Sequence, residues 1–241
     1  MRLDTNQREL ALKLVYFGPA LSGKTTNLRA LHERLLPARR GHLMELPTSE
    51  DRTLFFDTLP VLFRRGGLRL KIRVFTVPGQ VLHNSTRRLV LQGADGVAFV
   101  ADSQPYKRHD NFQYWAHLEE NLRAQGTSLD QLPHVVQWNK ADLGDDGTAQ
   151  AVAAMRHESR RPVFEAVATR GEGVVETFLG LASLVYATLD EEQGLTASVG
   201  LSPDAFIEEL RAAFIEPPPL PVLAAVETPG TLARLAAKGR A

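Results

Sequence analysis

The sequence predicts an α/β fold with a mostly parallel, six-stranded sheet, helices on both faces of that sheet and one antiparallel edge strand. Two observations support this prediction. Apolar runs of strand length alternate with helical runs from residue 10 to residue 189, which is the pattern of a doubly wound sheet. The run Gly-Val-Ala-Phe-Val-Ala-Asp at 96–102 is apolar up to its last residue, as expected of a parallel strand buried on both faces.

The individual elements follow from local patterns. We expect strands at 10–17, 54–63, 68–77, 96–102, 134–138 and 162–167, and helices at 24–36, 81–93, 110–124, 148–159 and 173–189. Pro37 ends the first helix because proline cannot continue it. Residues 68–77 alternate between apolar and mostly basic side chains after a Gly-Gly turn. This alternation predicts that 54–63 and 68–77 form the antiparallel pair at the sheet edge.

The chain is expected to divide into one globular domain, residues 1–189, and a C-terminal extension, residues 190–241. Within the extension we expect a linker at 194–200, a short helix at 203–215 and a proline-rich stretch at 217–221. The composition from residue 216 onward leaves two interpretations open. The segment is partly disordered, or it is a docking or autoregulatory element.

Composition narrows the class of protein. The 241 residues include 28 lysines and arginines and 28 aspartates and glutamates. The formal net charge is therefore zero, so no overall electrostatic attraction favours binding to nucleic acid or to an anionic membrane. Cysteine is absent, which excludes disulfides and thiol catalysis. The first nine residues are polar and unlike a signal peptide, and no apolar run has the length of a transmembrane segment. We therefore expect a cytoplasmic protein.

A phosphate-binding loop is predicted between the first strand and the first helix. Residues 18–25 read Gly-Pro-Ala-Leu-Ser-Gly-Lys-Thr, the pattern G-x-x-x-x-G-K-T. Glycines let the backbone close around a phosphate, and the N–H groups of the loop and of the helix start then face the anion. Lys24 is expected to reach the β- and γ-phosphates and the Thr25 hydroxyl to hold Mg²⁺. The expected nucleotide contacts come from Gly18, Ala20, Leu21, Ser22, Gly23, Lys24, Thr25 and Thr26.

A second pattern predicts which base is bound. Asn139-Lys140-Ala141-Asp142 follows the strand at 134–138 and reads N-K-x-D. The Asp142 carboxylate can accept two hydrogen bonds from guanine, whereas adenine would leave it unmatched. Since ligands of doubly wound sheets bind at the carboxyl ends of the strands, this pattern and the phosphate loop are expected to meet there.

Together these stretches give the chain a resemblance to Ras-like small GTPases, and most of all to the bacterial MglA family of cell-polarity and gliding-motility GTPases. The resemblance spans about residues 10–189. It is carried by the runs G-P-A-L-S-G-K-T-T-N-L at 18–28, E-D-R-T-L-F-F-D at 50–57, T-V-P-G-Q at 76–80, G-A-D-G-V-A-F-V-A-D-S-Q at 93–104 and N-K-A-D at 139–142. The run T-V-P-G-Q is the most specific, because the family has threonine where most small GTPases have aspartate.

The resemblance implies further site residues. Thr53 matches the switch threonine that, with Thr25, holds Mg²⁺. Gln80 matches the glutamine that orients the attacking water, and Arg52 matches an arginine finger supplied in cis. Gly79, Lys140, Ala168 and Thr169 also match nucleotide-binding positions, and the resemblance assigns the Ala168 amide to the guanine oxygen. The implied partners are GTP or GDP, an MglB-like roadblock-domain activator and other polarity or motility proteins that recruit the chain to a cell pole or the inner membrane surface.

One residue departs from the family pattern. Ala20 stands where these proteins usually have glycine, and its methyl group is expected to slow hydrolysis more than it weakens GTP binding. The leading interpretation is therefore a GTP-hydrolysing switch with Mg²⁺, and the alternative is a GTP-loaded scaffold with negligible hydrolysis. An ATP-dependent kinase is a weaker third interpretation, because it leaves the N-K-x-D pattern unexplained. The C-terminal extension, through the proline run or the apolar stripe Phe206, Leu210 and Phe214, is expected to compete for or extend the surface on which the activator docks.

Overall fold

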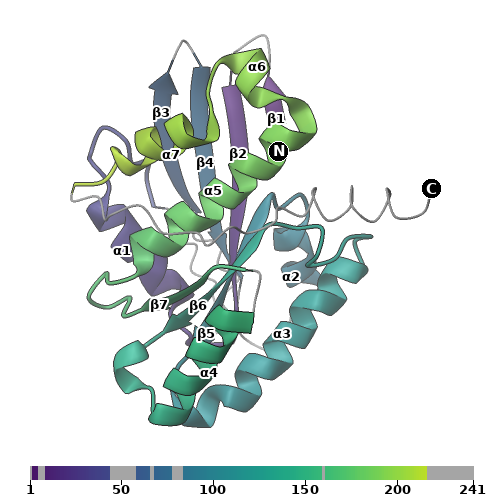
Figure 1. Ribbon diagram of the computed structural model, residues 1–241, viewed down its shortest axis with the longest axis vertical. Helices are drawn as coiled ribbons and strands as arrows, with labels where there is room; N and C mark the ends of the chain where they lie inside the picture. Colours follow the sequence, from purple (N-terminus) through teal and green to yellow (C-terminus); the bar gives the residue numbers. More distant parts are fainter. Residues whose placement is uncertain are drawn as a thin grey trace, which may run out of the picture.

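The fold is a seven-stranded sheet with helices on both faces (Figure 1). The computed structural model describes residues 2–4, 9–43, 58–65, 68–77, 84–158 and 161–215. Within these ranges the strand order is β3-β4-β2-β5-β6-β7, and β1 pairs with β2 outside this path. The strands are β1 Arg2–Asp4, β2 Glu9–Phe17, β3 Thr58–Arg65, β4 Leu68–Thr76, β5 Gly96–Asp102, β6 His134–Asn139 and β7 Val163–Ala166.

Five neighbouring strands, from β4 to β7 in this order, run parallel, which confirms the expected mostly parallel α/β sheet. β2 pairs in parallel with β4 on one side and, from Leu14 to Phe17, with β5 on the other. β3 pairs antiparallel with β4 at the edge of the sheet. The expected total of six strands is wrong for the described residues, because β1 pairs antiparallel with the first part of β2. Three residues that include an arginine and an aspartate carry no strand signal, so only the pairing with β2 defines β1.

Two layers of helices cover the sheet and form two separate cores. The helices are α1 Lys24–Arg34, α2 Asn84–Leu91, α3 Arg108–Arg123, α4 Asp146–Glu158, α5 Val174–Gln193, α6 Leu195–Val199 and α7 Pro203–Arg211. Alternate residues of β2 divide between the cores, because successive side chains of a strand point to opposite faces. Leu14 and Tyr16 pack with α1, α5 and α7, whereas Val15 and Phe17 pack with α2 and α3.

The C-terminal part of the chain up to Ile215 belongs to the first core. The expected boundary at residue 190 lies inside α5, and the expected linker at 194–200 contains the short helix α6. Phe206, Leu210 and Phe214 are buried, and the Phe206 ring stacks on Tyr186 with 4.1 Å between centroids. The expectation that this apolar stripe contacts a partner is therefore wrong, because α5 already covers it. The expected proline-rich stretch lies outside the described residues.

The last described residues are joined to the end of α1. Leu36 N–H donates to Ala213 O at 2.9 Å, and Ile215 N–H donates to Arg34 O at 2.8 Å. Leu35 and Phe214 form an antiparallel bridge between these two bonds. The segment after α7 thus holds the point at which the chain leaves α1.

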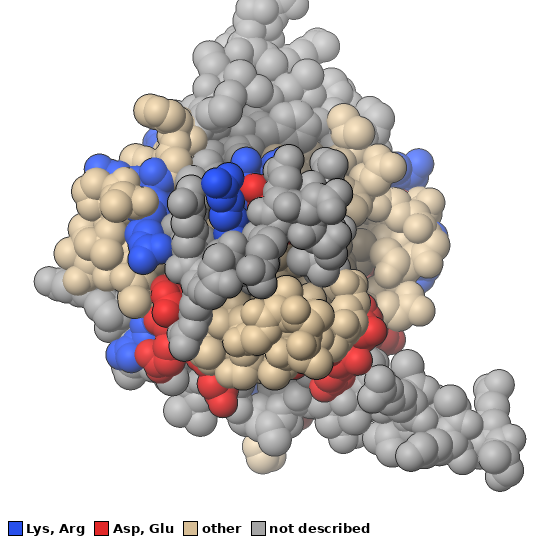
Figure 2. Space-filling model, turned by 90° about the horizontal axis from the view of Figure 1, so that it is seen from above, with Lys and Arg blue, Asp and Glu red and all other residues tan. Residues whose placement is uncertain are grey.

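The surface carries charges of both signs. On the face shown in Figure 2, acidic side chains lie around a patch of uncharged residues in the lower half of the view. Basic side chains lie mainly in the upper half. In the part of the chain that the structure describes, no helix is both long enough and apolar enough to cross a membrane.

Candidate functional site

The phosphate loop connects β2 to α1 with a backbone that requires glycine at two positions. Gly18 has φ +149°, and a Cβ there would lie 2.2 Å from Val100 O. Gly23 has φ +97°, and a Cβ there would lie 2.1 Å from Asn139 Nδ2. Leu21, at the exposed tip, adopts the left-handed conformation with φ 62°, which is costly for a residue with a branched side chain. The fold therefore holds the loop in a fixed and partly strained conformation.

Lys24 begins α1 and places a buried cation under this loop. Its ammonium group donates to Gly18 O at 2.9 Å and to Pro19 O at 2.5 Å. Among the described residues no carboxylate pairs with it. Burial, followed by the positive charge of Arg87 from α2, lowers the pKa of Lys24 to about 7. A buried cation held on backbone carbonyls, with a second cation near it, is suited to bind an anion.

Asn139 joins the phosphate loop to the loop that follows β7. Its Nδ2 donates to Ser22 O at 2.7 Å, and its Oδ1 accepts from Ala168 N–H at 3.0 Å. Both bonds are buried, and they connect residues that are far apart in the sequence. The expected meeting of the two motifs is observed, and Asn139 is the residue that connects them.

The neighbouring residues of this pattern are held by ion pairs. Lys140 has φ 61°, and its ammonium group contacts Asp102 Oδ2 at 2.5 Å. Asp102 ends β5 with a fully buried carboxylate, so this pair fixes the start of the loop. The Asp142 carboxylate remains partly exposed, and Arg170 approaches it at 3.4 Å. Asp142 is therefore accessible to a ligand, whereas the Lys140 ammonium is engaged with the protein.

The structure also contains a buried polar network that was not predicted. Gln137 Nε2 donates to Asn27 Oδ1 and to Thr177 Oγ1, both at 2.9 Å. Asn27 Nδ2 in turn donates to Gly23 O at 3.0 Å, so the network supports the phosphate loop from behind. The available signal is a glutamine within the expected strand at 134–138, because the contacts themselves span the chain.

The remaining expected site residues divide into two groups. Ala20, Thr25 and Thr26 lie in or next to the phosphate loop, as their places in the motif require, and Thr169 follows Ala168 at the end of β7. Arg52, Thr53, Gly79 and Gln80 lie outside the described residues.

A mostly parallel sheet with a glycine loop before α1 and an N-K-x-D loop after β6 defines the class of Ras-like P-loop proteins. No family model matches the chain. The chain is 40% identical over 188 residues to the mutual gliding-motility protein MglA of Myxococcus xanthus (strain DK1622), across 78% of this chain and 96% of that protein. The chain belongs to the MglA family.

Proposed function

We propose that the protein is a small GTPase switch that binds GTP or GDP with Mg²⁺ and hydrolyses GTP. The observation that supports this most directly is the buried Lys24 ammonium, which has only carbonyl partners among the described residues. It lies beside the phosphate loop, which Asn139 of the N-K-x-D motif joins to Ala168 in the loop after β7. Family membership supports the same proposal. The name of the relative extends it to gliding motility, and we propose that an MglB-like activator and other polarity proteins are its partners in the cytoplasm.

Each residue has a physical task in this proposal. Lys24 leaves its two carbonyls and pairs with the β- and γ-phosphates, while the loop N–H groups bind the same oxygens. Thr25 and Thr53 would hold Mg²⁺ with their hydroxyl groups, and the bound ion would supply positive charge beside the phosphate oxygens, on which negative charge develops during transfer. Arg52 and Gln80 stabilise that charge and orient the attacking water.

The contact that we propose for the guanine oxygen differs from the one that the family resemblance implies. Ala168 N–H already donates to Asn139 Oδ1, so it is not free to bind the base. The next amide, that of Thr169, has no acceptor among the described residues. We therefore assign the guanine oxygen to Thr169 N–H, and the guanine N1–H and exocyclic amine to the Asp142 carboxylate.

Nucleotide affinity and hydrolysis test the proposal directly. The purified protein is expected to bind GTP far more tightly than ATP in the presence of Mg²⁺ and to convert it to GDP in a single turnover. Asp142→Asn is expected to weaken GTP binding about ten- to hundredfold, since charge-assisted hydrogen bonds are lost. Asp146→Asn, in the first turn of α4, is the matched control and should leave the affinity unchanged. Equal binding of GTP and ATP would refute the assignment of Asp142 to guanine.

The Ala20→Gly variant, in the same single-turnover assay, tests whether the Ala20 methyl group slows hydrolysis.

The lowered pKa of Lys24 predicts a pH dependence of GDP binding. Phosphate binding favours the charged ammonium, so the complex has a higher Lys24 pKa than the free protein, in which it is about 7. GDP affinity is therefore expected to fall above about pH 7, by up to about tenfold per pH unit until the pKa of the complex is reached. Calorimetric titrations between about pH 7 and 9 measure this slope. The same slope in Lys24→Met would show that another group is responsible.

A further inference from the structure

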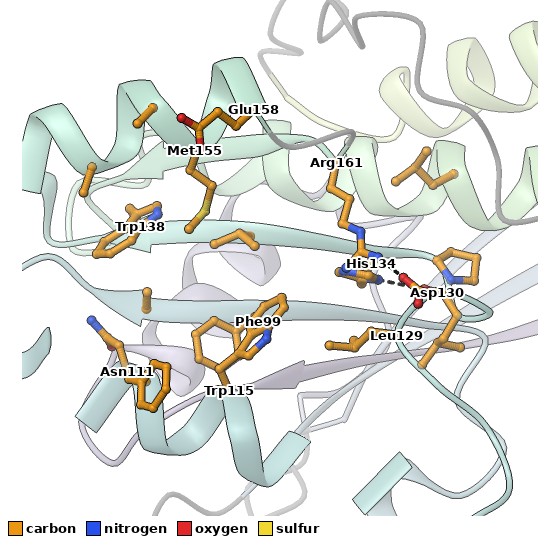
Figure 3. Close-up of a pocket in the computed structure, with 18 of the residues that line it drawn as sticks. Phe99, Asn111, Trp115, Leu129, Asp130, His134, Trp138, Met155, Glu158 and Arg161 are labelled. Atoms are coloured by element: carbon orange, nitrogen blue, oxygen red, sulfur yellow. Dashed lines mark hydrogen bonds and ion pairs between the residues drawn. The ribbon is translucent and has the colours of Figure 1, made fainter. Parts of the chain in front are cut away.

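A cavity lies between α3 and α4, over β5 and β6 (Figure 3). Its volume is about 1000 Å³, which is at the upper end of the range for small-molecule sites. No residue that we assign to nucleotide binding lines it. The space exists because α4 faces α3 with the small side chains of Ala151 and Ala154.

The walls of this cavity are largely aromatic. Phe99 and Trp115 meet edge to face with 5.0 Å between ring centroids. Trp138 and Met155 lie at one end, and His134 lies at the other (Figure 3). Phe112 lines the cavity from the α3 side, although its ring is mostly exposed. Such walls favour a flat ring system, because ring faces and edges bind one another in offset or T-shaped geometry.

The charged groups at the His134 end are already paired. Arg161 donates to Asp130 Oδ1 at 2.6 Å and also contacts His134 Nε2. His134 Nδ1 lies 2.8 Å from Leu132 O. Burial, followed by the charge of Arg161, lowers the pKa of His134 to about 4, so the ring is neutral and both nitrogens are engaged. This end of the cavity therefore offers no unpaired charge to a ligand.

The polar groups on the α3 side are also engaged. Asn111 uses both amide atoms on the backbone of Asp102, at 2.9 and 2.8 Å. Trp115 Nε1 donates to Glu119 Oε1 at 3.2 Å, and Arg108 is paired with Asp145 at 2.8 Å. Glu158 also lines the cavity, and its exposed carboxylate has no ion-pair partner among the described residues. The lining therefore disfavours an anionic ligand.

One donor in the wall remains without an acceptor. The indole Nε1–H of Trp138 is buried and has no hydrogen-bond partner among the described residues. An unmatched buried donor costs about 1–3 kcal/mol, and a ligand that supplies an acceptor recovers that cost. We propose that this cavity binds a flat aromatic molecule that has no negative charge and carries one hydrogen-bond acceptor for Trp138 Nε1.

The position of the cavity predicts a second property, which rests on the proposed function. Trp138 immediately precedes Asn139, and the ion pair between Arg108 and Asp145 joins α3 to the segment that leads from the N-K-x-D loop into α4. A ligand that bridges α3 and α4 therefore restrains both ends of that loop. Its binding is expected to slow the release of GDP.

Fluorescence titration with the neutral naphthyl ketone prodan tests the site without any nucleotide. The full chain is expected to bind one prodan molecule saturably, with a blue shift of its emission. Ala154→Trp fills the cavity and should weaken binding at least about tenfold, because the ring and the ligand compete for one space. Ala153→Trp, on the same helix but outside the cavity, is the matched control and should bind as the parent does. Trp138→Phe keeps a ring but removes the donor, and a loss of about three- to tenfold is expected.

Three outcomes would overturn parts of this inference. Absence of saturable binding, or an equal loss in Ala154→Trp and Ala153→Trp, would refute the site. Unchanged affinity in Trp138→Phe would refute the hydrogen bond. Release of radiolabelled GDP should slow about fivefold or more with saturating prodan, and an unchanged rate would refute the coupling alone. If the protein binds no GDP, the proposed function fails, but the prodan titration still shows whether the cavity binds a ligand.

Discussion

Phe206→Ala is expected to lower the free energy of unfolding by about 3–5 kcal/mol, the usual cost of removing a buried phenylalanine side chain. Phe206 is fully buried, belongs to the core that α1 and α5 form, and stacks on Tyr186 with an angle of 13° between the rings. Tyr186 also donates to Leu201 O at 2.7 Å, so the ring pair connects α5 to the segment that leads into α7. The loss would show that α7 is part of the domain core.

Chemical denaturation of the full chain, followed by circular dichroism, measures this change. Leu210→Ala offers a second buried site on α7, and Leu89→Ala is its matched control because Leu89 is 61% exposed on α2. We expect Leu210→Ala to cost about 2–5 kcal/mol and Leu89→Ala less than about 0.5 kcal/mol. If Phe206→Ala and Leu210→Ala were as stable as Leu89→Ala, α7 would contribute nothing to the stability of the domain.

Arg52→Ala is expected to slow GTP hydrolysis by about 10³–10⁵, the range that a finger arginine contributes to phosphoryl transfer. In the proposed mechanism, the guanidinium group stabilises charge that appears only as the bond to the γ-phosphate breaks. GTP affinity should therefore change little, because this interaction is made in the transition state. Single-turnover hydrolysis with separately measured GTP affinity distinguishes this loss from a failure to bind.

The control for this variant is Arg69→Ala, at an exposed position of β4. It removes an arginine side chain from a position to which we assign no role in catalysis, and it should leave hydrolysis unchanged. Gln80→Leu should reproduce the loss of hydrolysis, because the attacking water is then no longer oriented. If Arg52→Ala hydrolysed GTP at the rate of the parent, the finger would have to come from a partner or from another residue.

The parts of this fold that were predictable are those that local rules define. The phosphate loop could be located because its glycines are needed where a Cβ would meet Val100 or Asn139. The parallel sheet was predictable because the alternation of strands and helices is also a pattern that can be read along the sequence. Helix α6 lies within the expected linker, because five residues between two glycines are too few to show a helical period.

The remaining features depend on contacts between distant residues. The bond from Gln137 to Asn27 joins residues 110 positions apart, and no local pattern reports it. The use of the Ala168 amide by Asn139 likewise appears only when β6 and β7 lie side by side. The cavity beside Trp138 is also a tertiary feature, since it depends on the separation of α3 and α4 rather than on any single residue.

The bridge between Leu35 and Phe214 has a consequence for the synthesis of the chain on the ribosome. The end of α1 emerges early, whereas its partner strand emerges only after almost the whole described fold has been made. At about 5–20 residues per second, roughly ten to forty seconds separate the two. During that interval the apolar surface around Leu35 lacks its cover and is open to chaperones. The first helix of the nucleotide site is therefore among the last elements to be completed.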